Sequence, residues 1–462
     1  MTPTEALTLP ATPSTGLVTA LRRLEAFVVR PVDVAWLAAY RVLFGLALAV
    51  SMERFLHYGW IDSLLVAPRF RFHYWGFAWV QPMSSGAMHV LFYALFGLAL
   101  AVAAGLAFRI TAPLFALGLT YIQLVDVSTY LNHYYLAGLL AWLLALSPAH
   151  RAWSVDAWLS KRRAAEIPAA WLVLFRIQVG VVYVFAGLAK AQPDWLLHGQ
   201  PLAIWLGART DVPVLGRLFT VPGAPLAMSW FGFLFDFTIV AWLTWRRTRP
   251  FAYAVVVVFH VLTRVLFDIG MFPIIMSLSA LVFFDPSWPR FGRPAGDGER
   301  VDSPRRWALW VGAAWCALQL LLPLRCHLYG GNVLWHEQGM RFSWRVMVRA
   351  KGGATTFHVT DRVTGKTEDV SPRRYLTPFQ ENEMSSQPDL VLQLAHHIAR
   401  DFAARGHDVA VRAEVLESLN GRRSAPLVDP TVDLTAIDDG LAPASFLLPA
   451  PTEPPPHTRP VR

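Results

Sequence analysis

Long apolar runs separated by short polar loops dominate the first 324 residues of the sequence. Their repetition predicts a polytopic α-helical membrane bundle with about nine spans. The predicted spans are residues 34–52, 87–107, 112–127, 134–147, 169–189, 223–244, 251–267, 271–284 and 307–324. Two of these runs are short for a hydrocarbon core of about 30 Å, so we expect them to be tilted, re-entrant or completed by polar flanks.

Beyond residue 325 the pattern changes to that of a small α+β extramembrane domain. The stretches "MRFSWRVMVRA" and "ATTFHVTDRV" alternate as strands do, and "KGG" between them predicts a hairpin turn. "PDLVLQLAHHIARDFAARG" predicts an amphipathic helix, and "DVAVRAEVLESL" predicts another strand. The expected organisation is an N-terminal cytoplasmic segment (1–29), a transmembrane domain (30–324), an α+β domain (325–440) and a Pro-rich disordered tail (441–462).

Composition supports a membrane protein. Of the 462 residues, 55% are hydrophobic and only 16% are charged, against roughly 25% in soluble domains. The 19 tryptophans fit a membrane interface. The net charge of +9 does not indicate nucleic acid as a partner, because the excess lies in loops between apolar runs, where it fits membrane topology and anionic lipid.

The distribution of basic residues predicts the orientation. With the N-terminus in the cytoplasm, the inner loops carry 16 Lys and Arg residues and the outer loops carry 6. Nine spans then place the C-terminal domain outside, in the inner or plasma membrane if the source is bacterial. No signal peptide is visible, so we expect the first span to act as the insertion signal.

Cysteine usage gives no sign of a disulfide or a metal site. Ten helical residues separate Cys316 from Cys326, about 15 Å, which is too far for a disulfide unless the helix ends early. No Cys/His spacing typical of zinc is present. The Pro-, Gly- and charge-rich stretch 291–306 is interpreted as a linker within the membrane domain.

Lys190, at the outer end of the apolar run 169–189, is the sharpest candidate for chemistry. A lysine at a helix end is most often a snorkelling anchor. In a dry pocket, however, burial disfavours the ammonium form, so Lys190 would act as a general base. A close carboxylate would keep the amine charged, so we expect Asp194 not to pair directly with it.

Several other polar residues lie in or beside apolar runs. His133 belongs either to an interfacial aromatic belt or to a site where it donates to a developing oxyanion. His260 is either a helix-pairing residue or a functional one. For Arg41, Arg176 and Asp236 we favour buried structural pairing, although the sequence does not say which arginine meets Asp236.

The order and spacing of several motifs carry a family resemblance over about residues 30–440. The motifs are "RPVDVAWLAAYRVLFG", "YLNHYYLAGLLAW", "RAWSVDAWL", "LFRIQVGVVYVFAGLAKAQPDW", "FHVLTRVLFDIGMF", "FFDPSWPRF", "GMRFSWRVMV" and "DPTVDLTA". Together they resemble vitamin K-dependent gamma-glutamyl carboxylase and its bacterial relatives, which carry the horizontally transferred transmembrane domain.

The resemblance implies a carbon–carbon lyase that converts protein Glu to gamma-carboxyglutamate, using reduced vitamin K, dioxygen and carbon dioxide. Menaquinol is implied as the quinol if the source is bacterial. The family's catalytic lysine falls on Lys190, and its assisting histidine falls on His133. Asn132, Tyr183 and His260 are assigned to cofactor binding. The implied partners are a Glu-containing protein or peptide and the lipid bilayer, without nucleic acid.

Substrate binding is implied for Trp344 and Met347 in "FSWRVMV", and no metal site is implied. The chain departs from the family there, because Arg345 and Arg349 replace positions of different charge. The two cysteines do not reproduce the disulfide of the animal members. Two alternatives therefore stay open: a quinol epoxidase with a different acceptor, and a non-catalytic quinone-binding membrane protein.

Overall fold

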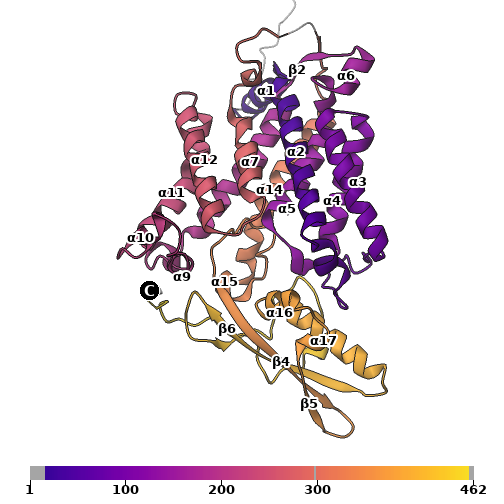
Figure 1. Cartoon of the computed structure of the whole chain (residues 1–462), viewed down its shortest axis with the longest axis vertical. Coiled ribbons are helices and arrows are strands. Elements are labelled where there is room, and N and C mark those ends of the chain that lie inside the picture. Colours follow the sequence, from indigo (N-terminus) through magenta and orange to yellow (C-terminus); the bar gives the residue numbers. More distant parts are fainter. Residues whose placement is uncertain (1–15, 296–297, 457–462) are drawn as a thin grey trace, which may run out of the picture.

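A helical bundle and a smaller α+β domain at one end of it make up the molecule in the computed structural model (Figure 1). The structure describes residues 16–295 and 298–456. Helix α1 and the short helix α6 lie at one end of the bundle, and the C-terminal domain lies at the other (Figure 1). The two regions that the sequence places on opposite sides of a membrane are therefore at opposite ends of the bundle.

The helices of the bundle follow the apolar runs of the sequence. They are α1 (Gly16–Val29), α2 (Ala35–His57), η1 (Ile61–Val66), α3 (Ser85–Ala104), α4 (Phe108–Leu124), η2 (Val127–Thr129), α5 (Asn132–Leu146), η3 (Ala149–Arg151), α6 (Val155–Ser160), α7 (Ala169–Lys190), α8 (Pro193–Leu196), α9 (Leu202–Gly207), α10 (Leu215–Phe219), α11 (Ala224–Thr244), α12 (Arg249–Leu266), α13 (Phe272–Ser279), η4 (Ala280–Phe283), η5 (Trp288–Arg290), α14 (Arg306–Leu321) and η6 (Leu322–Tyr329). Helix α7 is central, with α2 to α5 on one side and α11 and α12 on the other (Figure 1).

Within the described residues, six helical segments are long and apolar enough to cross a membrane. They are α2, α3, α7, α11, α12 and the continuous run of α14 with η6. Helix α4 and the run of α13 with η4 are apolar but shorter. Helix α5 has 15 residues, which rise about 22 Å and do not reach across a core of about 30 Å. The prediction of a helical membrane bundle is supported, whereas nine spans are not confirmed.

A three-stranded sheet ties together the end of the bundle that is remote from the C-terminal domain. Its strands are β1 (Pro31–Asp33), β2 (Ala164–Pro168) and β3 (Glu299–Arg300), in the order β1-β2-β3. Strands β1 and β2 are antiparallel, and β3 runs parallel to β2. The predicted linker 291–306 is thus fixed to the bundle by β3.

The C-terminal domain packs two helices on an antiparallel sheet. Its elements are α15 (Val333–His336), β4 (Lys351–Asp361), β5 (Thr367–Val370), η7 (Pro372–Arg374), α16 (Pro378–Ser385), α17 (Pro388–Ala403), β6 (Val409–Leu419), β7 (Ala425–Pro426) and η8 (Leu434–Ala436). The sheet order is β5-β4-β6-β7. Helix α17 buries one face against β6, which confirms both the predicted amphipathic helix and the predicted strand.

The hairpin predicted at "KGG" is wrong. These three residues open strand β4, and residues 340–350 before them form turns rather than a strand. Strand β4 pairs closely with β6 at Gly353. A Cβ on this residue would lie 2.6 Å from the carboxylate of Glu417, which explains why a glycine is suited to the position. The hairpin instead joins β4 to β5.

The C-terminal residues differ from the predicted free tail as far as they are described. Leu447 bridges to Val428, and the carbonyl of Leu448 accepts a hydrogen bond from Trp335 Nε1. Phe446 is buried in the core of the domain. Tertiary packing therefore orders the stretch to residue 456, and residues 457–462 lie outside the described part.

Two buried polar contacts join the domain to the bundle. Gln380 of α16 donates to Asp126 Oδ2 at 2.8 Å, in the loop that leads to α5. Asp194 of α8 accepts two hydrogen bonds from Arg422, at 2.6 and 2.7 Å, and one from Asn420 at 2.7 Å. Bidentate guanidinium–carboxylate pairs fix orientation as well as distance. The segment that follows Lys190 is thereby attached to the end of β6.

Candidate active site

Lys190 is the last residue of α7, and its amine is buried against α11. Lys190 Nζ lies 2.8 Å from Asp236 Oδ2, and it also donates to the carbonyl of Val346 at 3.4 Å. The helices approach closely at Gly187, where a Cβ would lie 2.7 Å from the backbone nitrogen of Phe237. This close packing brings the amine and the carboxylate into direct contact away from bulk water.

The pairing of Asp236 corrects the expectation that an arginine would meet it. Its partner is Lys190, while Arg41 and Arg176 both donate to backbone carbonyls. Asp194 is bound to the C-terminal domain and not to Lys190, as expected. A buried carboxylate, that of Asp236, nevertheless contacts the amine. It favours the charged form of Lys190, which is the effect expected of a close Asp194.

A second polar pair lies near the first, on α7 and α12. Tyr183 Oη and His260 Nε2 share a hydrogen bond of 3.1 Å, and both side chains are buried. His260 Nδ1 has no hydrogen-bond partner among the described residues. Burying a ring nitrogen in this way costs free energy unless a ligand or a water molecule forms a hydrogen bond with it.

Both pairs line one apolar cavity of about 140 Å³. The rest of its wall is mainly apolar: Val182, Ala186, Trp195, Leu202, Trp205, Met228, Phe231, Gly232, Phe259, Leu262, Thr263, Leu266, Phe267, Ile269, Phe272, Met276, Val346 and Met347. Phe231 and Leu262 are also exposed on the outer surface of the bundle. The cavity therefore borders the surface that faces lipid.

A polar cavity of about 200 Å³ adjoins the apolar one, and we call it the arginine cavity. Its lining is Val127, Ser128, Tyr130, Asn132, Glu337, Met340, Arg341, Arg345, Met347, Val348, Arg349, Glu383 and Gln387. Three arginines face two glutamates there, so the charge favours an anion. Burial also raises the pKa of Glu383, against the attraction of Arg349.

Two of these arginines have carboxylate partners and one has none. Arg349 lies 2.9 Å from Glu337, and Arg341 pairs with a carboxylate of α17. No ion pair forms at Arg345 among the described residues; its hydrogen bond goes to the thiol of Cys326 at 3.4 Å. A thiol is a weak acceptor, so the guanidinium of Arg345 is free to bind an anion.

The wall between the two cavities is the segment 342–347. Phe342, Trp344 and Met347 have φ values of 66°, 57° and 51°, in the left-handed region that non-glycine residues rarely adopt. Trp344 is buried and stacks on Tyr135 with ring centroids 5.0 Å apart. Met347 lines both cavities. Backbone strain of this kind is concentrated at functional sites.

Comparison with known families identifies both parts of the chain. The HTTM domain matches residues 29–288. The lumenal domain of vitamin K-dependent gamma-carboxylase matches residues 304–453. The chain belongs to the vitamin K-dependent gamma-carboxylase family. No solved structure matches it. Membership suggests vitamin K-dependent carboxylase function at a membrane.

Four of the residues predicted from sequence meet around the apolar cavity of this carboxylase-family chain. Lys190, Tyr183 and His260 line it directly, and Met347 lines it together with the arginine cavity. They come from α7, α12 and the segment before β4, so the fold brings together positions that lie far apart in sequence. Their assigned roles stay predictions.

The other three predicted residues lie around this cavity without lining it. Asn132 lines the arginine cavity. Trp344 belongs to the segment between the two cavities and stacks on Tyr135. His133 lines neither cavity; its ring lies 4.4 Å from that of Tyr134 and 6.4 Å from that of Phe272. Because Phe272 lines the apolar cavity, His133 is one aromatic ring away from it.

Two features of the site were missed by sequence reasoning. Asp236 was interpreted as a structural partner of an arginine, and nothing in its surroundings in the chain indicates Lys190, 46 residues earlier. The second feature is the basic cavity. The four-residue spacing of Arg341, Arg345 and Arg349 is a signal for it, although the segment is not helical.

Proposed function

We propose that the chain is an integral membrane, quinol-dependent gamma-glutamyl carboxylase and epoxidase. Two cavities that share Met347 carry the proposal. The apolar one holds a buried Lys–Asp pair, and the polar one holds an arginine without a carboxylate partner among the described residues. One cavity suits an apolar molecule that gives up a proton. The other suits a carboxylate.

The residues of the apolar cavity fit a reduced quinone. Its wall matches an apolar ring system and isoprenoid tail, and its border on the lipid-facing surface suits entry from the bilayer. His260 Nδ1, which lacks a partner among the described residues, and the amine of Lys190 are suited to bind hydroquinone oxygens. Reduced vitamin K, when bound, supplies the oxidisable hydroquinone whose reaction with dioxygen drives removal of the glutamate gamma-proton.

Within this proposal Lys190 and Asp236 act as one base. At 2.8 Å the buried carboxylate favours the ammonium form of Lys190, so the amine alone is a poor proton acceptor. A proton from a bound hydroxyl passes to Asp236 Oδ2 by way of Lys190, which keeps its positive charge beside the deprotonated oxygen. The pair and the hydroxyl are neutral in sum before and after the transfer, which an apolar cavity favours.

The arginine cavity holds the acceptor. Arg345 binds the gamma-carboxylate of the substrate glutamate, because it is the arginine there without a carboxylate partner in the described chain. Met347 and the buried Trp344 shape the passage toward Lys190. Carbon dioxide adds to the gamma-carbon after its proton leaves. The substrate itself fills the cavity and displaces water, which would quench the carbanion.

The decisive experiment gives the detergent-solubilised protein reduced vitamin K, labelled bicarbonate and a Glu-rich peptide, beside the Lys190→Ala variant. We expect label in the peptide together with quinone epoxide, and loss of both in the variant. Epoxide without label would favour the epoxidase with another acceptor. If the folded wild-type protein forms neither product, the result would favour a non-catalytic quinone-binding membrane protein.

We also propose that the N-terminus is cytoplasmic and the C-terminal domain lies outside. The support is the excess of basic residues at the α1 end of the bundle and the position of the C-terminal domain at the other end (Figure 1). Protease added outside intact spheroplasts should cleave the C-terminal domain and spare an N-terminal tag. The reverse pattern would invert the topology.

A further inference from the structure

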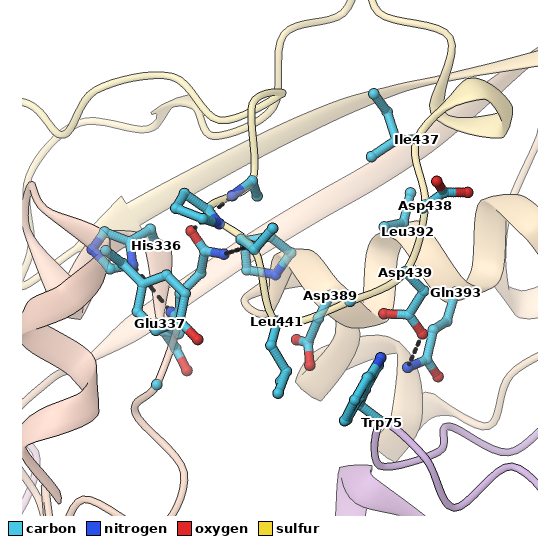
Figure 2. A pocket seen from close by; sticks show the side chains of 18 of the residues that line it. Trp75, His336, Glu337, Asp389, Leu392, Gln393, Ile437, Asp438, Asp439 and Leu441 are labelled. Carbon is cyan, nitrogen blue, oxygen red and sulfur yellow. Dashed lines mark hydrogen bonds between the residues drawn. The ribbon is translucent and has the colours of Figure 1, made fainter. Parts of the chain in front are cut away.

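A large open cleft lies between the C-terminal domain and the loop that precedes α3. Its volume is about 690 Å³, within the range of ligand-binding clefts, roughly 300–1,000 Å³. Its lining includes the stretch 436–446, the start of α17 and, beside Gln393 of that helix, Trp75 (Figure 2). Nothing in the proposed chemistry uses this cleft.

The cleft adjoins the proposed site. Glu337 and Arg341 line both the cleft and the arginine cavity. Met347 then joins the arginine cavity to the apolar cavity of Lys190. A polypeptide lying in the cleft therefore lies beside the arginine cavity, and only the segment that contains Met347 separates that cavity from the one of Lys190.

The charges of the cleft are unbalanced toward acid. Its lining holds four carboxylates and two arginines, Arg325 and Arg341. Two of the carboxylates are paired. Glu337 pairs with Arg349 and Lys351, and Asp389 pairs with Arg341. The other two are Asp438 and Asp439.

Asp438 and Asp439 are consecutive and exposed, and neither has a Lys or Arg partner among the described residues. Asp439 accepts a hydrogen bond from Gln393 at 3.1 Å. Trp75, whose surface is 60% exposed, lies close to Asp439 and Gln393 (Figure 2). An aromatic face beside carboxylates that lack a Lys or Arg partner among the described residues is a suitable surface for a Lys or Arg side chain.

Building on the proposed function, we propose that this cleft docks the protein substrate through a basic residue that flanks the modified glutamate. The backbone of the substrate lies along the 436–446 stretch. Its Lys or Arg side chain contacts Asp439 and Trp75, and Asp438 adds negative charge at the same wall, while the glutamate enters the arginine cavity. The cleft thus selects glutamates in a basic context, and the arginine cavity selects the carboxylate.

The test compares two peptides that differ only beside one central glutamate, with lysines or with glutamines as flanking residues. Both are given to the wild type, to an Asp438→Asn/Asp439→Asn variant, and to a Glu368→Gln/Asp369→Asn variant. The last is the matched control, because it removes two consecutive exposed carboxylates on β5, remote from the cleft. The readouts are KM for carboxylation and the binding anisotropy of fluorescent peptides whose glutamate is replaced by glutamine.

We expect the lysine peptide to bind the wild type and the control about fivefold to tenfold more tightly than the glutamine peptide, the size of two exposed ion pairs. This preference should vanish in the Asp438→Asn/Asp439→Asn variant, and 0.5 M salt should weaken the preference of the wild type. Equal affinity of the wild type for both peptides, or the same loss in the control variant, would overturn the proposal. Preference for an acidic-flanked peptide would do so as well.

The binding arm separates this inference from the proposed function. Lysine-dependent binding without carboxylation would keep the docking cleft and reject the carboxylase. Carboxylation of both peptides with equal KM would keep the carboxylase and reject the docking cleft.

Discussion

The apolar cavity and the arginine cavity solve the problem of buried charge in opposite ways. In the first, one cation and one anion, Lys190 and Asp236, form a close pair within almost wholly apolar walls. In the second, Arg345 has no carboxylate partner among the described residues, although acids lie nearby. The first keeps its charges balanced, and the second keeps a cation available.

The difference follows from where the two cavities lie. A charge inside a membrane bundle needs its partner built in, because water and mobile ions are far away. The arginine cavity borders the open cleft and the C-terminal domain, where water is a temporary partner for a guanidinium. The balanced pair of the apolar cavity suits proton transfer. The available cation of the arginine cavity suits reversible binding of an anion.

The largest effect is expected from Asp236→Asn, which breaks the balanced pair. If Asp236 receives the proton, epoxide formation should fall by about 10²- to 10⁴-fold, the usual contribution of a general base. Lys190→Arg should retain more activity than Lys190→Ala, because a guanidinium keeps the positive charge. The measurement is the initial rate of epoxide formation.

Thr238→Val is the matched control, since Thr238 lies on the same helix and bonds only its own helix at Leu234. It should leave the rate unchanged. An Asp236→Asn variant as active as the wild type would show that the amine of Lys190 acts alone.

The second effect concerns the ion pair of Arg422 and Asp194, which attaches the segment after Lys190 to the C-terminal domain. Arg422→Ala should lower the stability of the folded protein by about 3 kcal/mol, because it leaves Asp194 as a buried, unpaired charge. Thermal unfolding in detergent measures this loss. The adjacent exposed Arg423→Ala is the control and should unfold as the wild type does.

The same pair gives a pH dependence with a definite sign. Burial raises the pKa of Asp194, but the hydrogen bonds from Arg422 and Asn420 outweigh it and hold the pKa below its ordinary value. The stabilisation is therefore complete above the unfolded pKa of about 3.9 and is lost as the pH falls through the folded value. The difference between wild type and Arg422→Ala should shrink on acidification, and a constant difference would contradict this account.

The third effect concerns Arg345, the cation without a carboxylate partner among the described residues. Arg345→Gln should raise KM for a Glu peptide by about tenfold to a hundredfold, the loss of one charge-assisted hydrogen bond, and leave KM for the quinol unchanged. Arg349→Gln is the comparison, because Arg349 is already engaged by Glu337. Equal effects of the two substitutions would remove the distinction between them.

The smallest effect is on stability alone, at a buried carboxylate outside both cavities. Burial raises the pKa of Glu417, against the attraction of Lys351. Its ionisation therefore costs stability as the pH rises above the ordinary Glu value of about 4.3. Glu417→Gln should stabilise by about 1 kcal/mol at pH 8 and by less at pH 5. Exposed Glu414→Gln on the same strand is the control for thermal unfolding.

The sequence alone determined the elements whose signal is local. Apolar runs marked the bundle helices, and the periodicities of residues 388–406 and 408–419 marked α17 and β6. Motif resemblance also marked Lys190, Tyr183 and His260, which the structure places around one cavity. These features depend on which face of an element is buried, and a short window of sequence records that face.

Tertiary structure alone decided which charges are paired. Asp236 meets Lys190 because a glycine on α7 allows close approach to α11. Arg345 lacks a carboxylate partner among the described residues, and its hydrogen bond goes to the thiol of Cys326. The alternating pattern of residues 340–350 predicted a strand, but packing of Trp344 on Tyr135 accompanies a strained turn there. Such outcomes depend on contacts between distant segments, whose distances and competing partners no local pattern encodes.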